Sequence, residues 1–466
     1  MAQWVNLVNG DAGGFAKTFV SVLGGTHEYP ATVRTIVWFR QDLRLADNPA
    51  LSHAAAQGEV VPVFVWAPGE EGDWPPGAAS RWWMHHSLAA LDADLRRLGS
   101  RLVIRRGPSA DALRSLLVET SSDGVVWNRR YEPAAIARDS SIKREVERTR
   151  SFNGSLLHEP WTMPGRSGAG FRVFTPFWRA LLAGGAPEPP LPVPALSAPG
   201  AWPESLDVGS LGLLPPVRWD GGMAATWKPG EQGAVARLAA FLERAAAYGA
   251  DRDRPALPSS ELSPHLHHGE LSPRQVWHAV SESAGPAAET FLRQLAWREF
   301  AHHLLYHVPE TVTEPLRPAF RAMPWRDDAA GLHAWQRGRT GFGLVDAGMR
   351  QLWASGWMHN RARMVTASFL TKDLLIHWHA GARWFWDTLV DADLANNSLG
   401  WQWVAGSGAD AAPFFRVFSP LRQAERFDPD GRDQDRWLSG DRAEQMLDHE
   451  SARRRALDAY EAVRRS

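Results

Sequence analysis

The sequence contains no cysteine among its 466 residues. Disulfide bridges, thiolate metal sites and a cysteine nucleophile are therefore excluded. A chain without cysteine is compatible with a reducing compartment, so we expect the protein in the cytoplasm. The sequence also lacks any apolar run of the about 18 residues that a membrane helix needs, and it lacks the basic-then-apolar start of a secretory signal. We expect no membrane partner.

An excess of charge of either sign is missing too. Lys plus Arg number 51 and Asp plus Glu number 52, which gives a formal net charge of -1. This balance excludes a uniformly basic surface for nucleic acid but leaves room for a local basic patch. The candidate patch is the stretch from Arg293 to Arg363, which holds ten arginines, no lysine and six acidic residues, a net charge of +4.

Tyrosine is scarce and tryptophan abundant, with 5 and 24 copies respectively. Packing alone rarely requires so many of the largest side chains, which are also the most easily oxidised. We expect most of these tryptophans in the core and a few in a functional role.

The first third of the chain predicts an α/β fold. Short β-branched apolar runs alternate with helical stretches, one signalled by Asn48-Pro49 and another spanning 80–98 with leucines at helical spacing. This alternation is typical of a doubly wound, parallel, Rossmann-like sheet. We place an N-terminal extension at 1–32 and the α/β domain at 33–165. The expected strands are 33–39, 60–66, 101–104 and 124–127.

The rest of the chain predicts a linker and an all-helical domain. Residues 182–216 hold nine prolines and five glycines, which is typical of a semi-extended surface segment. We place the interdomain linker at 166–229 and the helical domain at 230–466. Its expected helices are 234–248, 287–307, 343–355, 358–377 and 380–390.

One unusual run in the helical domain is SSELSPHLHHGELSPRQVW at 259–277. Ser259, Ser260 and Ser263 precede a helical pattern, and such hydroxyls either bind an anion or serve as an ordinary N-cap. Three histidines follow within five residues, but no cysteine or paired carboxylate completes a metal site, so we expect no metal.

A second unusual run spans 357–420. Asp391 and Asp393 could hold Mg²⁺ in a phosphoryl-transfer enzyme, but no phosphate-cradling glycine loop or catalytic lysine accompanies them. An Arg–Asp pair inside a polar ligand pocket fits better, because Arg361 and Arg363 lie upstream.

Several motifs resemble the photolyase/cryptochrome family. They are WFRQDLRLADNPAL (38–51), FTPFWRALL (174–182), LSPHLHHGELSPRQ (262–275), WREF (297–300) and the whole of 338–431. The likeness is greatest to class I cyclobutane pyrimidine dimer photolyases and spans about 34–431. It implies an α/β antenna domain, a long linker and a helical domain that binds FAD.

The resemblance also implies roles for individual residues. By this resemblance, Asn397 would face flavin N5, and Arg363 and Asp391 would form an ion pair beside the ring. The full set of cofactor contacts that it implies is Tyr248, Ser259, Ser260, Glu261, Leu262, Ser263, Arg298, Asn360, Arg363, Asp391, Asp393 and Asn397. The electron chain that photoreduces the flavin would run outward through Trp401, Trp378 and Trp325. The residues that match contacts to the extruded dimer are Arg252, Gln294, Trp297, Asn360, Arg361, Met364 and Trp403.

Three departures from the family pattern stand out. The phosphate motif begins with Ser259 where the family has threonine, and Glu261 replaces a basic residue. Gln294 stands where dimer photolyases have glutamate and where (6-4) photolyases and many cryptochromes have glutamine. The segment WNRRYEP (127–133) matches neither a folate nor a deazaflavin antenna cleanly, so the second chromophore stays open.

The resulting hypothesis is light-driven repair of cyclobutane pyrimidine dimers by a monomeric, FAD-containing lyase that binds UV-damaged DNA. A (6-4) photolyase would carry catalytic histidine where this chain has Asn360 and Met364. A cryptochrome photoreceptor is the alternative from another class. The plant type has aspartate where this chain has Asn397, and signalling members often carry long C-terminal extensions.

Overall fold

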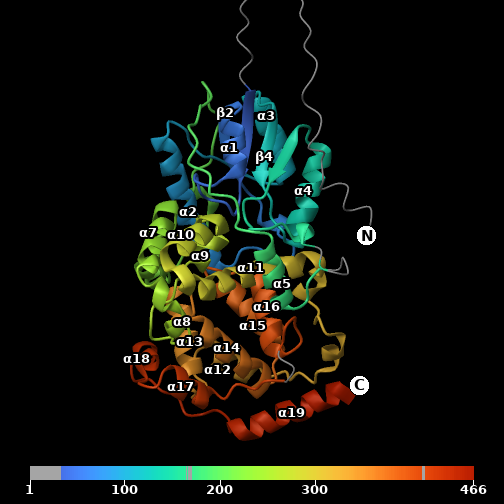
Figure 1. The fold of residues 1–466 in the computed structure, drawn as a ribbon, viewed down its shortest axis with the longest axis vertical. Helices are drawn as coiled ribbons and strands as arrows, with labels where there is room; N and C mark the ends of the chain where they lie inside the picture. Colours follow the sequence, from blue (N-terminus) through green and yellow to red (C-terminus); the bar gives the residue numbers. More distant parts are fainter. Residues whose placement is uncertain (1–32, 164, 166–169, 412–414, 466) are drawn as a thin grey trace, which may run out of the picture.

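The computed structural model describes residues 33–163, 165, 170–411 and 415–465, and the predicted N-terminal extension lies outside these ranges. An α/β domain forms one end of the molecule and a larger helical domain the other (Figure 1). Within the described ranges no helix combines the length and apolarity that crossing a membrane requires.

The α/β domain contains one five-stranded sheet in the order β3-β2-β1-β4-β5, and every pairing is parallel. Successive side chains of β1 enter different cores: Val37 and Phe39 pack on one face, Ile36 and Trp38 on the other. Burial on both faces explains the continuous apolar run. The strands are Val33–Phe39 (β1), Gly58–Trp66 (β2), Val103–Arg106 (β3), Gly124–Asn128 (β4) and Thr149–Phe152 (β5).

The doubly wound sheet is thus as predicted, but the strands differ in detail. Strand β2 begins two residues earlier than expected, and β4 ends one residue later. Strand β3 begins two residues later than expected. Strand β5 escaped prediction because its sequence, TRSF, has a single large apolar residue and lies at the sheet edge. The helices of this domain are Pro49–Ala55 (α1), Ala78–Arg97 (α2), Ser109–Thr120 (α3) and Pro133–Glu145 (α4).

The predicted linker, 166–229, is more structured than expected. It contains Phe174–Ala183 (α5), whose Phe174, Phe177, Trp178 and Leu181 belong to the core of the helical domain. The proline-rich part lies along the α/β domain, where Val60 N–H donates to the Ser197 carbonyl. The linker therefore joins both cores, because its few large apolar residues are enough to anchor it.

The helical domain contains the remaining helices. They are Gly221–Thr226 (α6), Glu231–Leu242 (α7), Tyr248–Asp251 (α8), Ser263–His267 (α9), Pro273–Ala284 (α10), Ala288–His307 (α11), Ala329–Gln336 (α12), Gly343–Ser355 (α13), Asn360–Ser368 (α14), Trp378–Thr388 (α15), Leu394–Ala405 (α16), Pro420–Phe427 (α17), Arg432–Leu438 (α18) and His449–Arg465 (α19). Short 3-10 turns lie at Pro68–Glu70, Pro160–Thr162, Gly209–Leu211, Ala245–Ala247, Gly285–Ala287, Pro309–Val312 and Pro318–Ala322.

The helix expected over 358–377 is divided. Helix α14 ends at Ser368, a π-helical turn follows over Phe369–Asp373, and Leu375 adopts a left-handed conformation (φ 54°). His377 then caps α15 by accepting a hydrogen bond from His379 N–H at 3.1 Å. Histidine is not among the favoured N-cap residues, so the sequence carried no clear start signal for α15.

The two domains meet at a backbone contact. Leu43 N–H donates to the His268 carbonyl at 3.2 Å, and Arg44 Nη1 donates to the Gly269 carbonyl at 2.9 Å. Gly269 has a φ of +67°, and a Cβ there would lie 2.1 Å from the Gln41 carbonyl oxygen. The sequence after β1 thus packs directly against the turn after α9.

Candidate functional site

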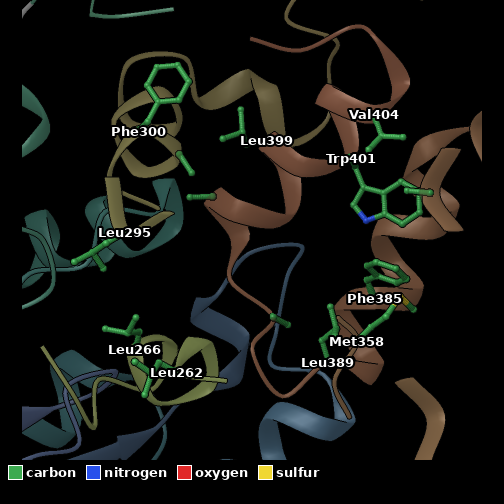
Figure 2. Close-up of a cluster of buried hydrophobic side chains, with 14 of the residues drawn as sticks. Leu262, Leu266, Leu295, Phe300, Met358, Phe385, Leu389, Leu399, Trp401 and Val404 are labelled. Atoms are coloured by element: carbon green, nitrogen blue, oxygen red, sulfur yellow. The ribbon is translucent and has the colours of Figure 1, made fainter. Parts of the chain in front are cut away.

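A cavity of about 610 Å³ opens within the helical domain, a size typical of sites for cofactors and other small molecules. Figure 2 shows part of its apolar wall, with Leu262, Leu266 and Leu295 on one side and Trp401, Phe385 and Met358 on the other. The residues predicted as cofactor and substrate contacts line it, as do Trp401 and Asn397, but Trp378, Trp325 and Arg361 do not.

The loop before α9 brings serine hydroxyls to one end of the cavity. Ser259, Ser260 and Ser263 all line it, and Trp357 Nε1 donates to Ser263 Oγ at 3.3 Å. Tyr248 lines the same cavity, and burial raises the pKa of its phenol, so it stays neutral. Arg298 adds a positive charge to the lining. Hydroxyls beside a guanidinium suit a phosphate-bearing ligand.

An ion pair between Arg363 and Asp391 also lines the cavity. Arg363 Nη2 lies 2.8 Å and 3.1 Å from the two oxygens of Asp391, and Arg363 Nε donates to the Met358 carbonyl at 2.7 Å. The pair joins α14 to the segment before α16. The predicted Arg–Asp pair is therefore present and borders the cavity.

Asp393 caps α16 instead of reaching the Arg363 pair. It accepts a hydrogen bond from Asn396 N–H at 2.8 Å, and His302 Nε2 lies 3.4 Å from its Oδ2. Burial alone would raise the pKa of Asp393, but the imidazoles of His302 and His267 and the Arg298 charge hold that pKa well below its usual range. Asp393 is thus a fixed negative charge in the cavity lining.

The three histidines of the 259–277 run have separate structural partners. His265 Nδ1 lies 2.5 Å from Glu270 Oε2, and His268 Nε2 lies 3.1 Å from the Val390 carbonyl. His267 borders the cavity, and its Nδ1 lies 3.8 Å from Asp393 Oδ2. Among the described residues, no three histidine, aspartate or glutamate side chains lie close enough together to hold a metal ion.

Asn397 presents its amide in a defined orientation. Its Nδ2 donates to the Ala382 carbonyl at 3.1 Å, which assigns the NH₂ group to the side facing Ala382. Because the residue lines the cavity, Oδ1 is the atom left to accept a hydrogen bond from a ligand.

The tryptophans predicted as an electron chain differ in burial. Trp401 (3% exposed) and Trp378 (2% exposed) are both buried, but only Trp401 lines the cavity, and Trp325 is half-buried. His377 lies between the last two, with ring centroids 5.6 Å from Trp378 and 5.2 Å from Trp325. Trp335, which sequence reasoning missed, contacts Trp401 edge to face at 6.2 Å. Nothing in the sequence distinguishes it from the many core tryptophans.

Two tryptophans and an amide side chain, predicted to contact the DNA substrate, also line the cavity. Trp297 stacks on Phe174 with centroids 3.9 Å apart, and Trp403 Nε1 donates to the Asp410 carbonyl at 3.1 Å. Gln294 borders the same space, and its Nε2 lies 3.4 Å from the Thr290 carbonyl. Each indole is thus fixed by a neighbour.

The two arginines predicted to contact the DNA, Arg252 and Arg361, are partly neutralised by an acidic neighbour. Arg361 pairs with Asp253 at 2.7 Å and lies over the Phe427 ring, and Arg252 lies 3.8 Å from the same carboxylate. Asp253, which the sequence interpretation passed over, therefore sets the local charge.

The crevice at the carboxyl ends of β1 and β4, where doubly wound sheets bind ligands, is filled by side chains. Arg130 pairs with Glu71 at 2.8 Å and with Glu132 at 3.1 Å, and Arg138 pairs with Glu71 at 3.0 Å. A small cavity of about 30 Å³, lined by residues of both domains, borders this cluster of ion pairs.

Comparisons with known proteins place these features in a family. The model described as "DNA photolyase" matches residues 35–195, and that of the "FAD binding domain of DNA photolyase" matches residues 291–443. A deoxyribodipyrimidine photo-lyase of Agrobacterium fabrum is 48% identical over 413 residues, covering 86% of each chain. Cryptochrome-2 of Arabidopsis thaliana is 39% identical, covering 87% of this chain and 70% of the relative.

A solved structure agrees with this. The crystal structure of a bacterial class III photolyase from Agrobacterium tumefaciens has a TM-score of 0.90 and 44% identity, covering 95% of this chain and all of the other. The expected likeness to class I is therefore corrected to a likeness to class III. The chain contains an FAD-binding domain and belongs to the photolyase/cryptochrome family.

Proposed function

We propose that the protein splits cyclobutane pyrimidine dimers in UV-damaged DNA, using light and reduced FAD. The observation that carries this proposal is that one cavity is lined both by the serine, arginine and aspartate groups suited to FAD and by the two tryptophans, Trp297 and Trp403, suited to flat bases. The name of the Agrobacterium fabrum relative, deoxyribodipyrimidine photo-lyase, supports the same reaction.

The donor set fits FAD. Ser259, Ser260 and Arg298 would hold the phosphates, and the Arg363–Asp391 pair would border the isoalloxazine. When bound in its reduced form, FAD supplies the electron that light transfers to the dimer. The residues of this chain position the two partners and exclude water from between them.

Trp297 and Trp403 would bind the dimer after it leaves the helix. A damaged base pair costs less to unstack than an intact one, and stacking on an aromatic face contributes about 1–3 kcal/mol per base. Arg252, Asn360 and Met364 border the same opening, where they would contact the dimer or its backbone. We place Arg361 at the edge of this surface, because Asp253 holds it.

Light-dependent repair of a dimer-containing oligonucleotide by the purified, reduced protein tests the proposal. We expect repair under blue light and none in the dark. Trp297→Ala should weaken binding of damaged DNA by about 1–3 kcal/mol and leave FAD content unchanged. The matched control is Trp353→Ala, since Trp353 is 61% exposed and does not border the cavity.

Equal affinity for damaged and undamaged duplex, with no repair, would contradict this proposal and favour a cryptochrome-type photoreceptor. Gln294→Glu sharpens that distinction. We expect the parent to be active and this variant to change the repair yield per photon by a modest factor, because glutamine keeps both a donor and an acceptor without a charge. Repair by the Gln294→Glu variant but not by the parent would show that the natural chain does not repair dimers, and would favour the photoreceptor.

We further propose that the protein acts as a monomer and that any folate or deazaflavin antenna binds outside the crevice at β1 and β4. The Arg130, Glu71 and Glu132 ion pairs occupy that crevice. Mass spectrometry of the chromophores released from the purified protein, together with its mass in solution, tests both points.

A further inference from the structure

Two arginines, one within α7 and one just after it, contact the serine loop. Arg237 Nη1 lies 2.5 Å from Glu261 Oε2, and Arg244 Nη2 donates to the Ser259 carbonyl at 2.7 Å. Arg237 lies in the middle of α7, and Arg244 follows two residues after the helix ends at Leu242. They therefore hold two points of the loop that places the serines in the cavity.

The backbone of Glu261 is unusual. Its φ is +52°, in the left-handed region that few residues other than glycine occupy. Such a conformation persists where the surrounding structure imposes it. The neighbouring Ser260 and Leu262 both line the cavity, so the conformation at Glu261 sets the direction of the loop on either side.

Arg237 is itself fixed. Its guanidinium lies 5.3 Å from the ring centroid of Trp227, and its Nη2 donates to the Thr226 carbonyl at 3.2 Å. Trp227 is buried and donates to the Ser355 carbonyl at 2.7 Å. The ion pair thus links Glu261 to a rigid part of the helical domain.

We propose that Glu261, held by Arg237, is a positioning residue that keeps the phosphate-binding loop of the FAD site in its left-handed turn. The proposal rests on the function proposed above. It explains how an acidic residue can replace a basic one in the lining of this cavity: Arg237 neutralises the Glu261 carboxylate, and the ion pair supports the backbone turn.

The test is a double-mutant cycle on the full-length protein, read as the dissociation constant for FAD after removal and re-addition of the flavin. Arg237→Met should weaken FAD binding about tenfold, the scale of one charged hydrogen bond. Glu261→Ala should do the same. Glu261→Gly should stay close to the parent, because glycine adopts positive φ without support.

The decisive comparison is Arg237→Met in the Glu261→Gly background, where we expect little further change. A general loss of helix packing would weaken FAD binding equally in both backgrounds, and that result would overturn the proposal. Unchanged FAD affinity in the two single variants, Arg237→Met and Glu261→Ala, would also overturn the proposal. Arg114→Met, which removes an exposed ion pair on α3, is the matched control. A parent that binds no FAD would overturn the proposed function itself.

Discussion

At the scale of single residues, hydrogen bonds decide which face of a side chain a ligand meets. Asn397 shows this, because its NH₂ group is committed to the Ala382 carbonyl at 3.1 Å and only Oδ1 is left as an acceptor. An aspartate at this position could keep the contact to Ala382 only in its protonated form, since two acceptors repel each other.

We therefore expect Asn397→Asp to change the flavin absorbance spectra recorded during illumination and air reoxidation, because the new side chain places a titratable group beside the ring. Asn397→Ala removes the amide without adding an acid and serves as the control. Parent-like spectra in the aspartate variant would contradict the assigned position of Asn397.

Trp401 is the tryptophan of the predicted chain that reaches the cavity. We expect Trp401→Phe to slow photoreduction of FAD severely, since phenylalanine is far harder to oxidise, while repair by chemically reduced protein should survive. Transient absorption measures the rate.

Trp335→Phe is the matched variant, because Trp335 contacts Trp401 from another direction. A rate that falls in this variant, but not in Trp378→Phe, would move the electron path from Trp378 to Trp335.

At the scale of elements, helix α18 contains a buried acidic residue, Asp433, in its first turn. Asp433 is 2% exposed, and one of its oxygens has no hydrogen-bond partner. Burial, together with the nearby negative charge of Asp428, raises its pKa to about 6. Asp428 in turn accepts from the backbone N–H groups of Asp433 and Gln434.

Because the pKa of Asp433 is raised by folding, ionisation costs more in the folded state than in the unfolded state. The free energy of unfolding should fall as pH rises from about 4 to about 6 and stay lowered above that range. We expect Asp433→Asn to raise stability at pH 7.5 by about 2 kcal/mol and to change little below pH 4, as measured by denaturant unfolding. Asp435→Asn, exposed on the same helix, should show no such pH dependence.

At the scale of the whole molecule, domain docking depends on close backbone approach at Gly269. A Cβ there would lie 2.1 Å from the Gln41 carbonyl oxygen and 2.6 Å from Asp42 Cα. The same turn follows α9, so its position fixes the serine loop as well as the interface. Glu299 of α11 forms a second contact between the domains by accepting hydrogen bonds from the Leu157 and His158 N–H groups. Burial raises the pKa of Glu299 to about 7.

We expect Gly269→Ala to lower the melting temperature and FAD content together, because the clash forces the domains apart. The matched control is Gly99→Ala: its φ of +75° is similar, but nothing lies within 4 Å of the added carbon. Backbone strain alone costs about 1–3 kcal/mol, so the difference between the two variants measures the contribution of docking. Equal losses would contradict the role of the interface.

Much of the architecture was predictable from local pattern. The run VRTIVWF specified a strand buried on both faces, and leucine spacing specified α2, because both signals arise from residues close in sequence. The motifs at 259–277 and 357–420 likewise pointed to residues that line the cavity. Strand β5 was not predictable, because a short edge strand such as TRSF has no apolar run that marks it. The division of 358–377 was not predictable either, because the cap of α15 is a histidine, which is not a usual N-cap residue.

The sequence by itself determined the fold class, the family likeness and the residue types of the site, since these follow from periodicity and from motifs. The tertiary structure alone decided that His302 lies against Asp393, that Trp335 contacts Trp401, and that Arg237 holds Glu261. The reason is physical: these partners lie 24 to 91 residues apart in the chain, so only packing determines their distances and orientations.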